Sequence, residues 1–232
     1  MKKHIPNTIT CCNLICGCIA TYWALCGIYD VALLFVVAGA VFDFFDGMTA
    51  RLLHVSSPIG KELDSLADDI TFGLAPSAML FDYVKASASL LPWHYLCYAA
   101  FIMAAFSALR LAKFNLDERQ TTSFIGLPTP ANALFWGALI VGGGDSWLAG
   151  VPPLALLGMM LVSCWLLVAE LPLFALKFKT WGWQGNEVKY IFLLGCIPLL
   201  LFFGVTGLAA VIAWYVVLSA VAARLPQSSK SV

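Results

Sequence analysis

Long apolar runs separated by short polar segments are the feature that most restricts the fold of this sequence. A helix that crosses a bilayer takes about 20 residues, and most of the runs approach or exceed that length. The chain is 61% hydrophobic and 11% charged, whereas a soluble domain carries charge on about a quarter of its residues. The runs predict helices at residues 9–28, 31–53, 59–83, 91–111, 130–141, 153–174, 188–203 and 205–223.

The expected fold class is therefore all-α, a polytopic transmembrane bundle of about eight spans. The fifth and seventh runs are short, so bundles of about six or seven spans remain alternatives. We expect one integral membrane domain over residues 1–232, with a six-helix catalytic core at about 5–175 and two additional spans at about 188–223. The N-terminal run is interpreted as an uncleaved first span.

Lys and Arg are distributed unevenly between the two sides of the predicted bundle. With the N-terminus in the cytoplasm, all 13 of them except Lys85 fall on cytoplasmic segments. This asymmetry follows the positive-inside rule and predicts that both termini and the larger polar loops face the cytoplasm, in the cell (inner) membrane. The formal net charge is zero, which offers no electrostatic basis for binding nucleic acid.

The second predicted helix carries two carboxylates and two small residues on one face. The spacing i, i+3, i+4 and i+7 gathers on this face Asp43, Asp46, Gly47 and Ala50. Because the glycine and the alanine have almost no side chain, a bulky ligand could approach the helix backbone there. Arg51 follows near the end of the helix.

A second acidic pair follows on the third predicted helix. Asp64 and Asp68 are four residues apart and share a face, while Asp69 lies about 100° further round a regular helix. The loop at residues 53–58 is short, so we expect the second and third helices to be antiparallel neighbours with both acidic pairs near their cytoplasmic ends. Glu62 and Asp69 are interpreted as bystanders, and Glu170 has no assigned role.

Four carboxylates at one depth repel one another unless cations bind between them. Hard oxygen ligands suit Mg²⁺ or Mn²⁺, and Ca²⁺ is an alternative ion for such a site. Two ions held by shared carboxylates are a known arrangement for displacement at phosphorus. The residues therefore predict a divalent-metal site, with two ions, that faces a phosphorylated ligand.

These acidic and small residues resemble the signature of the CDP-alcohol phosphotransferase family. The family pattern is D-x2-D-G-x2-A-R, a spacer of seven or eight residues, and then G-x3-D-x3-D. Its fixed positions are matched by Asp43, Asp46, Gly47, Ala50, Arg51, Gly60, Asp64 and Asp68. Four further stretches resemble the membrane-embedded phosphatidylserine synthases of bacteria and archaea within this family: IGKELDSLAD (59–68), FGLAPS (72–77), LRLAKFN (109–115) and FIGLPTPAN (124–132).

The resemblance implies an enzyme that transfers the phosphatidyl group from CDP-diacylglycerol to L-serine, with CMP as the second product. It implies a homodimer embedded among membrane lipids, with a cavity that opens to the cytoplasm. It implies metal ligands at Asp43, Asp46 and Asp64, with Asp68 nearby as the general base for the serine hydroxyl. Other CDP-alcohol phosphotransferases use glycerol 3-phosphate or an inositol phosphate, so these acceptors are the alternatives, together with an intramembrane prenyltransferase and a divalent-cation carrier.

The resemblance also assigns the residues that contact the nucleotide. Gly47 and Ala50 are expected against the cytidine nucleotide, and Arg51 is expected to brace a carboxylate or reach the diphosphate. Gly60 would permit close approach of the third helix. Asn7 and Thr10, at the cytoplasmic end of the first helix, would line the same cavity or form an N-cap pair.

Serine needs a partner for its carboxylate, and the sequence offers several candidates. The basic ones are Arg110, Lys113 and Arg119 on the cytoplasmic side. The same residues are equally well explained as anchors that contact lipid headgroups. Thr129 and Asn132, within the PTPAN stretch, are the polar candidates.

Overall fold

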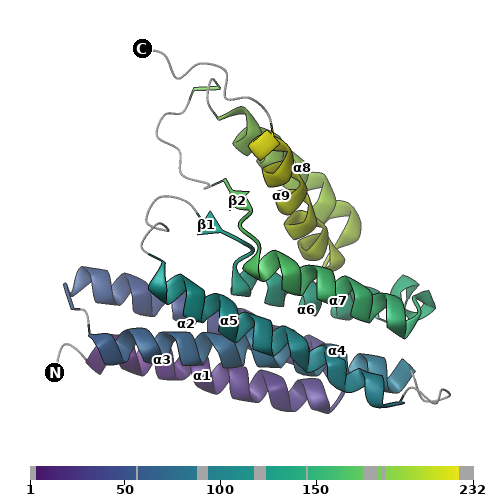
Figure 1. Cartoon of the computed structure of the whole chain (residues 1–232), viewed down its shortest axis with the longest axis horizontal. Coiled ribbons are helices and arrows are strands. Elements are labelled where there is room, and N and C mark those ends of the chain that lie inside the picture. Colours follow the sequence, from purple (N-terminus) through teal and green to yellow (C-terminus); the bar gives the residue numbers. More distant parts are fainter. Residues whose placement is uncertain are drawn as a thin grey trace.

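The computed structural model describes residues 4–55, 57–87, 94–117, 124–144, 146–174, 182–183 and 186–224, and within these ranges the chain is overwhelmingly helical (Figure 1). The elements in chain order are α1 (His4–Leu25), α2 (Tyr29–Leu52), α3 (Pro58–Asp68), η1 (Asp69–Leu74), α4 (Ala75–Ser87), η2 (His94–Phe101), α5 (Ile102–Leu116), β1 (Phe124–Ile125), α6 (Thr129–Gly143), η4 (Trp147–Gly150), α7 (Pro153–Val168), β2 (Pro172–Leu173), α8 (Glu187–Phe203) and α9 (Thr206–Arg224). The all-α fold class predicted from the apolar runs is confirmed.

Four helices of the described chain are long and apolar enough to cross a membrane, namely His4–Leu25, Tyr29–Leu52, Tyr95–Leu116 and Thr206–Ala223. The chain is therefore a membrane protein by the length and composition of its helices. Every predicted apolar run overlaps a helical segment, although the sixth run extends beyond the end of its helix. The count of eight spans and the cytoplasmic position of both termini stay predictions.

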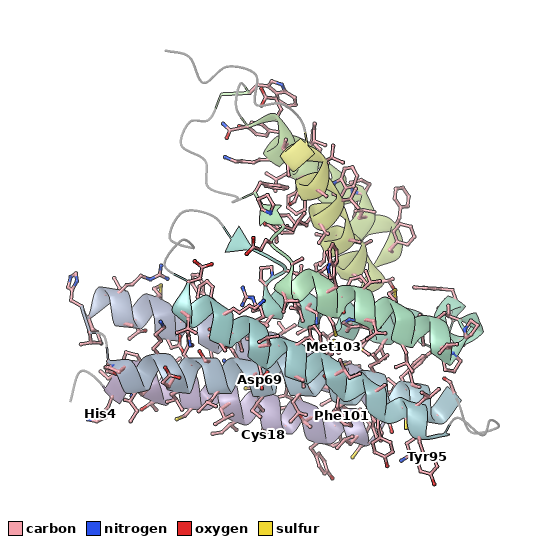
Figure 2. All side chains as sticks on the ribbon, viewed as in Figure 1. His4, Cys18, Asp69, Tyr95, Phe101 and Met103 are labelled. Carbon is pink, nitrogen blue, oxygen red and sulfur yellow. The ribbon has the colours of Figure 1, made fainter. Side chains whose placement is uncertain are left out.

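Helix α1 organises the first part of the bundle because it packs against α2, α3, η1 and α4. The start of α3 is defined locally: Pro58 occupies its first turn, and the N-cap Ser57 accepts a hydrogen bond from the Gly60 backbone N–H through Oγ. Both features favour helix initiation. In Figure 2, His4 and Tyr95 lie at opposite ends of the bundle and Asp69 lies between them.

The third helical segment runs without a break from residue 58 to residue 87 but changes its winding on the way. Its centre, η1, is a π-helix from Asp69 to Leu74 that follows directly after Asp68. Short π-segments within α-helices occur frequently at functional sites. Beyond η1, α4 is buried from Ala75 to Phe81 and at Tyr83 and Val84, and its last three residues are exposed.

The apolar core lies in the half of the bundle away from the acidic residues. Its largest fully buried side chains include Met79 of α4, Met103 of α5, Trp136 of α6 and Met160 of α7. Met79 comes about three helical turns after Asp68 on the same continuous segment. The closely packed apolar half of the bundle thus holds in place the helices that carry the signature residues in the polar half.

The sixth apolar run ends earlier than the predicted residue 174, because α7 stops at Val168. A proline cannot donate a helical hydrogen bond and disfavours helix at the residue before it, and here Pro172 and Leu173 form β2. This strand pairs antiparallel with β1, with Phe124 opposite Leu173. Gly126 follows β1 with φ +76°, and a side chain there would meet the Leu167 carbonyl oxygen at 2.8 Å. This turn sets the start of α6.

Helices α8 and α9 pack against each other, and α9 also packs against α6 (Figure 1). They correspond to the two additional C-terminal spans expected from the sequence. Their outer faces carry large exposed apolar side chains, including Leu201, Phe202 and Val217. Such faces are typical of helices that contact lipid.

Candidate active site

Three carboxylates from two helices meet near the polar end of the bundle. Asp43 of α2 and Asp64 and Asp68 of α3 each offer one oxygen, and these oxygens lie within 4.8 Å of one another. Asp43 and Asp64 are partly exposed, while Asp68 is buried. Because like charges repel strongly away from bulk water, this acidic triangle is a place where a cation would be stabilised.

Asp46 lies next to the acidic triangle but has a partner of its own. Its buried carboxylate accepts a hydrogen bond from the Thr10 hydroxyl of α1. Asp46 is close enough to Asp64 for their charges to interact. The structure therefore brings together all four aspartates of the signature, with three in the triangle and Asp46 beside it.

A cavity of about 270 Å³ opens beside these aspartates between α1, α2 and α3. Its lining comprises Pro6, Asn7, Thr10, Asp46, Gly47, Ala50, Val55, Ser57, Gly60, Lys61 and Asp64. Most of the nucleotide-contacting candidates predicted from the sequence thus share one cavity.

The two signature glycines differ in what surrounds them. A Cβ atom placed on Gly47 would meet nothing closer than the Arg51 guanidinium at 3.9 Å, so Gly47 faces open space in the cavity. A Cβ atom on Gly60 would lie 2.9 Å from the Ser57 hydroxyl and 3.0 Å from the Asn7 amide oxygen. Gly60 therefore permits close packing of α3 on α1, whereas Gly47 leaves volume for a ligand.

Arg51 does not line this cavity but lies next to Gly47, which does. Its side chain is exposed, and its Nε donates a hydrogen bond to the Gly47 carbonyl oxygen. This contact within α2 keeps the guanidinium next to the open space at Gly47.

The residues predicted to bind the serine acceptor lie in different parts of the fold. Arg110 of α5 is 8% exposed, donates from Nη1 to the Thr129 hydroxyl over 3.4 Å, and lies close enough to Asp68 for their charges to interact. Lys113, one turn further on, is exposed. Asn132 is buried and lines a separate apolar cavity of about 200 Å³ between α6, α7 and α9. Arg119 lies outside the described residues.

One known protein family matches most of the chain. The family described as CDP-alcohol phosphatidyltransferase matches residues 3–181. The chain belongs to this family. The resemblance inferred from the signature is thereby confirmed, and the match ends before α8 and α9.

Several relatives of this CDP-alcohol phosphatidyltransferase chain carry the name CDP-diacylglycerol–serine O-phosphatidyltransferase. The Bacillus subtilis protein is 40% identical over 128 residues, which cover 55% of this chain and 70% of that protein. The Methanocaldococcus jannaschii protein is 32% identical over 162 residues, 68% of this chain and 71% of that protein. The Helicobacter pylori protein is 37% identical, and the match spans about half of its length, 54%.

Two polar residues of this family member lie near the signature, and only Asn13 contacts an aspartate of the acidic triangle. Asn13 of α1 is fully buried and donates a hydrogen bond to Asp68. Its sequence signal is a polar residue three positions after Thr10, on the same face of an apolar helix. Asp69 belongs to η1 and faces Ser107 of α5 rather than the acidic triangle, as its angular offset from Asp68 predicted.

Proposed function

We propose that this chain transfers the phosphatidyl group of CDP-diacylglycerol to the hydroxyl of L-serine, forming phosphatidylserine and CMP. The observation that carries the proposal is the acidic triangle of Asp43, Asp64 and Asp68. Asp64 lines the cavity that has open space at Gly47, and Asp68 is close enough to the buried Arg110 for their charges to interact. The names of the bacterial and archaeal relatives support serine as the acceptor.

The acidic residues fit divalent metal ions. The triangle gathers three hard oxygen ligands within 4.8 Å of one another, which suits Mg²⁺ or Mn²⁺. We propose that Asp43, Asp46 and Asp64 hold two such ions and that Asp68 lies beside them. When bound, such ions neutralise diphosphate oxygens and make the phosphorus more electrophilic.

The nucleotide of CDP-diacylglycerol would occupy the cavity between α1, α2 and α3. Gly47 and Ala50 leave room beside α2 for the cytidine or its ribose, and Arg51 stands at the rim, where a phosphate could reach it. Asn7 and Gly60 line the opposite wall, where the Asn7 amide is available to a polar group of the nucleotide. Thr10 instead orients Asp46.

Asp68 is the proposed general base. It would accept the proton of the serine hydroxyl as that oxygen forms a bond to the β-phosphorus, which bears the diacylglycerol. The bond from this phosphorus to the oxygen that bridges to CMP breaks in the same step, and CMP leaves with the electron pair. Holding the hydroxyl, the base and the phosphorus in line supplies most of the acceleration in such a transfer.

Arg110 is the proposed anchor for the serine carboxylate. It is a buried cation near Asp68, so a carboxylate bound to it would bring the hydroxyl of the same small molecule close to the base. Thr129 holds the guanidinium in place. Lys113 and Asn132 lie on an exposed surface and in another cavity respectively, so Arg110 and Thr129 are our preferred pair.

We further propose that the protein lies in the cell membrane with about eight spans. Both termini and the active site would face the cytoplasm, and the protein would form a homodimer. The distribution of Lys and Arg supports the orientation. In the structure, Lys61 lines the nucleotide cavity, so a basic side chain lies at the same end of the bundle as the acidic triangle.

The test is an assay of the purified protein in detergent with CDP-dioleoylglycerol, radiolabelled L-serine, and Mn²⁺ or Mg²⁺. We expect labelled phosphatidylserine, loss of product when EDTA is added, and recovery when excess metal is restored. Parallel reactions contain labelled glycerol 3-phosphate or an inositol phosphate. Product from one of these acceptors, with none from serine, would overturn the choice of acceptor.

A further inference from the structure

Asn13 is a buried amide in the middle of an apolar helix, and it contacts the proposed base. Its Nδ2 donates a hydrogen bond to Asp68 Oδ1 over 3.1 Å, and none of its surface is exposed. The signature does not include this residue. The contact joins α1 to the last aspartate of the signature on α3.

The surroundings of Asn13 hold its amide in one place. The backbone carbonyl oxygen of Asn13 accepts a hydrogen bond from the Thr71 hydroxyl of η1 over 3.0 Å. A Cβ atom on Gly39 of α2 would lie 2.9 Å from Asn13 Oδ1 and 2.5 Å from Thr71 Cγ2, so only a glycine leaves space for both groups. Three elements, α1, α2 and η1, therefore enclose this side chain.

The π-helix contributes to this enclosure. Thr71 lies three residues after Asp68, and its hydroxyl is directed to α1 while Asp68 receives the Asn13 amide. Gly17 of α1 permits the approach, because a Cβ atom there would lie 2.8 Å from Thr71 Cα. Asp68 is thus held both by its own segment and by a donor from α1.

The Asn13 side-chain amide donates a hydrogen bond to Asp68 through its nitrogen, but its oxygen is less well satisfied. Within the described residues, Asn13 Oδ1 has no hydrogen-bond partner. A buried polar atom without a partner lowers stability, so this position is poorly suited to a residue whose role is only structural. An amide N–H that donates to one oxygen of a carboxylate fixes the orientation of that carboxylate.

We propose that Asn13 is a positioning residue that orients the Asp68 carboxylate for proton transfer. By engaging Oδ1, it fixes rotation of the carboxylate and directs Oδ2 towards the acceptor hydroxyl. The inference rests on the proposed role of Asp68 as base, but it holds for any alcohol acceptor. Groups that orient a reacting or metal-binding carboxylate typically change activity by about 10- to 100-fold when they are removed.

Two variants test this proposal. Asn13→Leu keeps a similar shape and removes the donor, while Asn13→Asp keeps the shape and replaces the N–H with an acceptor. Thr21→Val is the matched control on α1, because it removes a hydroxyl that donates to the Gly17 carbonyl oxygen of the same helix. Turnover is measured as CMP release with serine and, in separate reactions, with the other alcohols. A failure of serine as acceptor can therefore be distinguished from a failure of the role proposed for Asn13.

We expect kcat to fall by about 10- to 100-fold in both Asn13 variants, with KM for CDP-diacylglycerol changed by no more than about twofold. The affinity for CDP and the melting temperature in detergent report whether the cavity and the fold are intact. A purely structural role would lower the melting temperature and the CDP affinity together with kcat. Wild-type kcat in Asn13→Leu or Asn13→Asp, or equal losses in kcat and CDP affinity, would overturn the proposal.

Discussion

Replacing Gly47 with alanine should make the protein more stable and less able to bind its nucleotide substrate. Gly47 lies within α2, where glycine is less favourable than alanine by about 0.5–1 kcal/mol. The added methyl group would meet only the Arg51 guanidinium, at 3.9 Å. Since no clash offsets the gain in helix propensity, we expect Gly47→Ala to stabilise the free protein.

The size of the stability change follows from these values. One kcal/mol raises the melting temperature of a protein of this length by about 2–4 °C. We therefore expect an increase of about 1–4 °C for Gly47→Ala. Gly39→Ala is the contrasting control on the same helix, because its methyl group would lie 2.5 Å from Thr71 Cγ2. Overpacking of this kind costs about 1–3 kcal/mol, so the control should melt earlier.

The effect on binding has the opposite sign. In the proposed complex the nucleotide occupies the space beside Gly47, and a methyl group there would overpack the ligand at a cost of about 1–3 kcal/mol. That range corresponds to roughly 5- to 150-fold weaker binding. We expect Gly47→Val to bind still more weakly, because its side chain fills more of the 270 Å³ cavity.

The assay combines two measurements on the same detergent-purified samples. Thermal melting without ligand reports stability, and competition of CDP against a labelled CDP-lipid reports affinity. The expected combination for Gly47→Ala is a higher melting temperature with lower affinity. Unchanged affinity in Gly47→Ala and Gly47→Val would refute the placement of the nucleotide, even if the stability change had the expected sign.

Two further predictions concern the base and the acceptor site. Asp68→Asn should lower turnover by at least about 100-fold while CDP-lipid binding is retained. The control Asp69→Asn should remain active because Asp69 faces Ser107. Near-normal CMP release by Asp68→Asn would exclude Asp68 as the base. Arg110→Leu should raise KM for serine about tenfold or more, since a hydrogen bond to a charged group contributes about 1.5–3 kcal/mol. The control Lys113→Leu, at an exposed position, should change KM for neither serine nor CDP-diacylglycerol. An equal rise in KM for CDP-diacylglycerol in Arg110→Leu would contradict the role of Arg110 as a serine anchor.

Local patterns in the sequence were sufficient for the helices and for most of the site. A helix in lipid must satisfy all of its backbone hydrogen bonds internally, so a long apolar run has few alternatives. The predicted runs accordingly coincide with helical segments. The exception is the end of the sixth run, where Pro172 starts a short strand instead of continuing α7.

The sequence by itself determined which residues share a face of one helix. The spacing of Asp43 with Asp46, and of Asp64 with Asp68, follows from the helical period alone. The match to the family signature depends on the same spacing, and the family comparison confirmed it.

Only the tertiary structure decided which faces meet. The rotation of one helix against another depends on the packing of side chains that lie far apart in the chain, and no local pattern contains it. The small residues Gly17, Gly39 and Gly60 let α1 approach η1, α2 and α3 closely. That approach brings Thr10 to Asp46 and Asn13 to Asp68. The turn at Gly126 and the pairing of β1 with β2 set the start of α6, where the Thr129 hydroxyl accepts a hydrogen bond from Arg110.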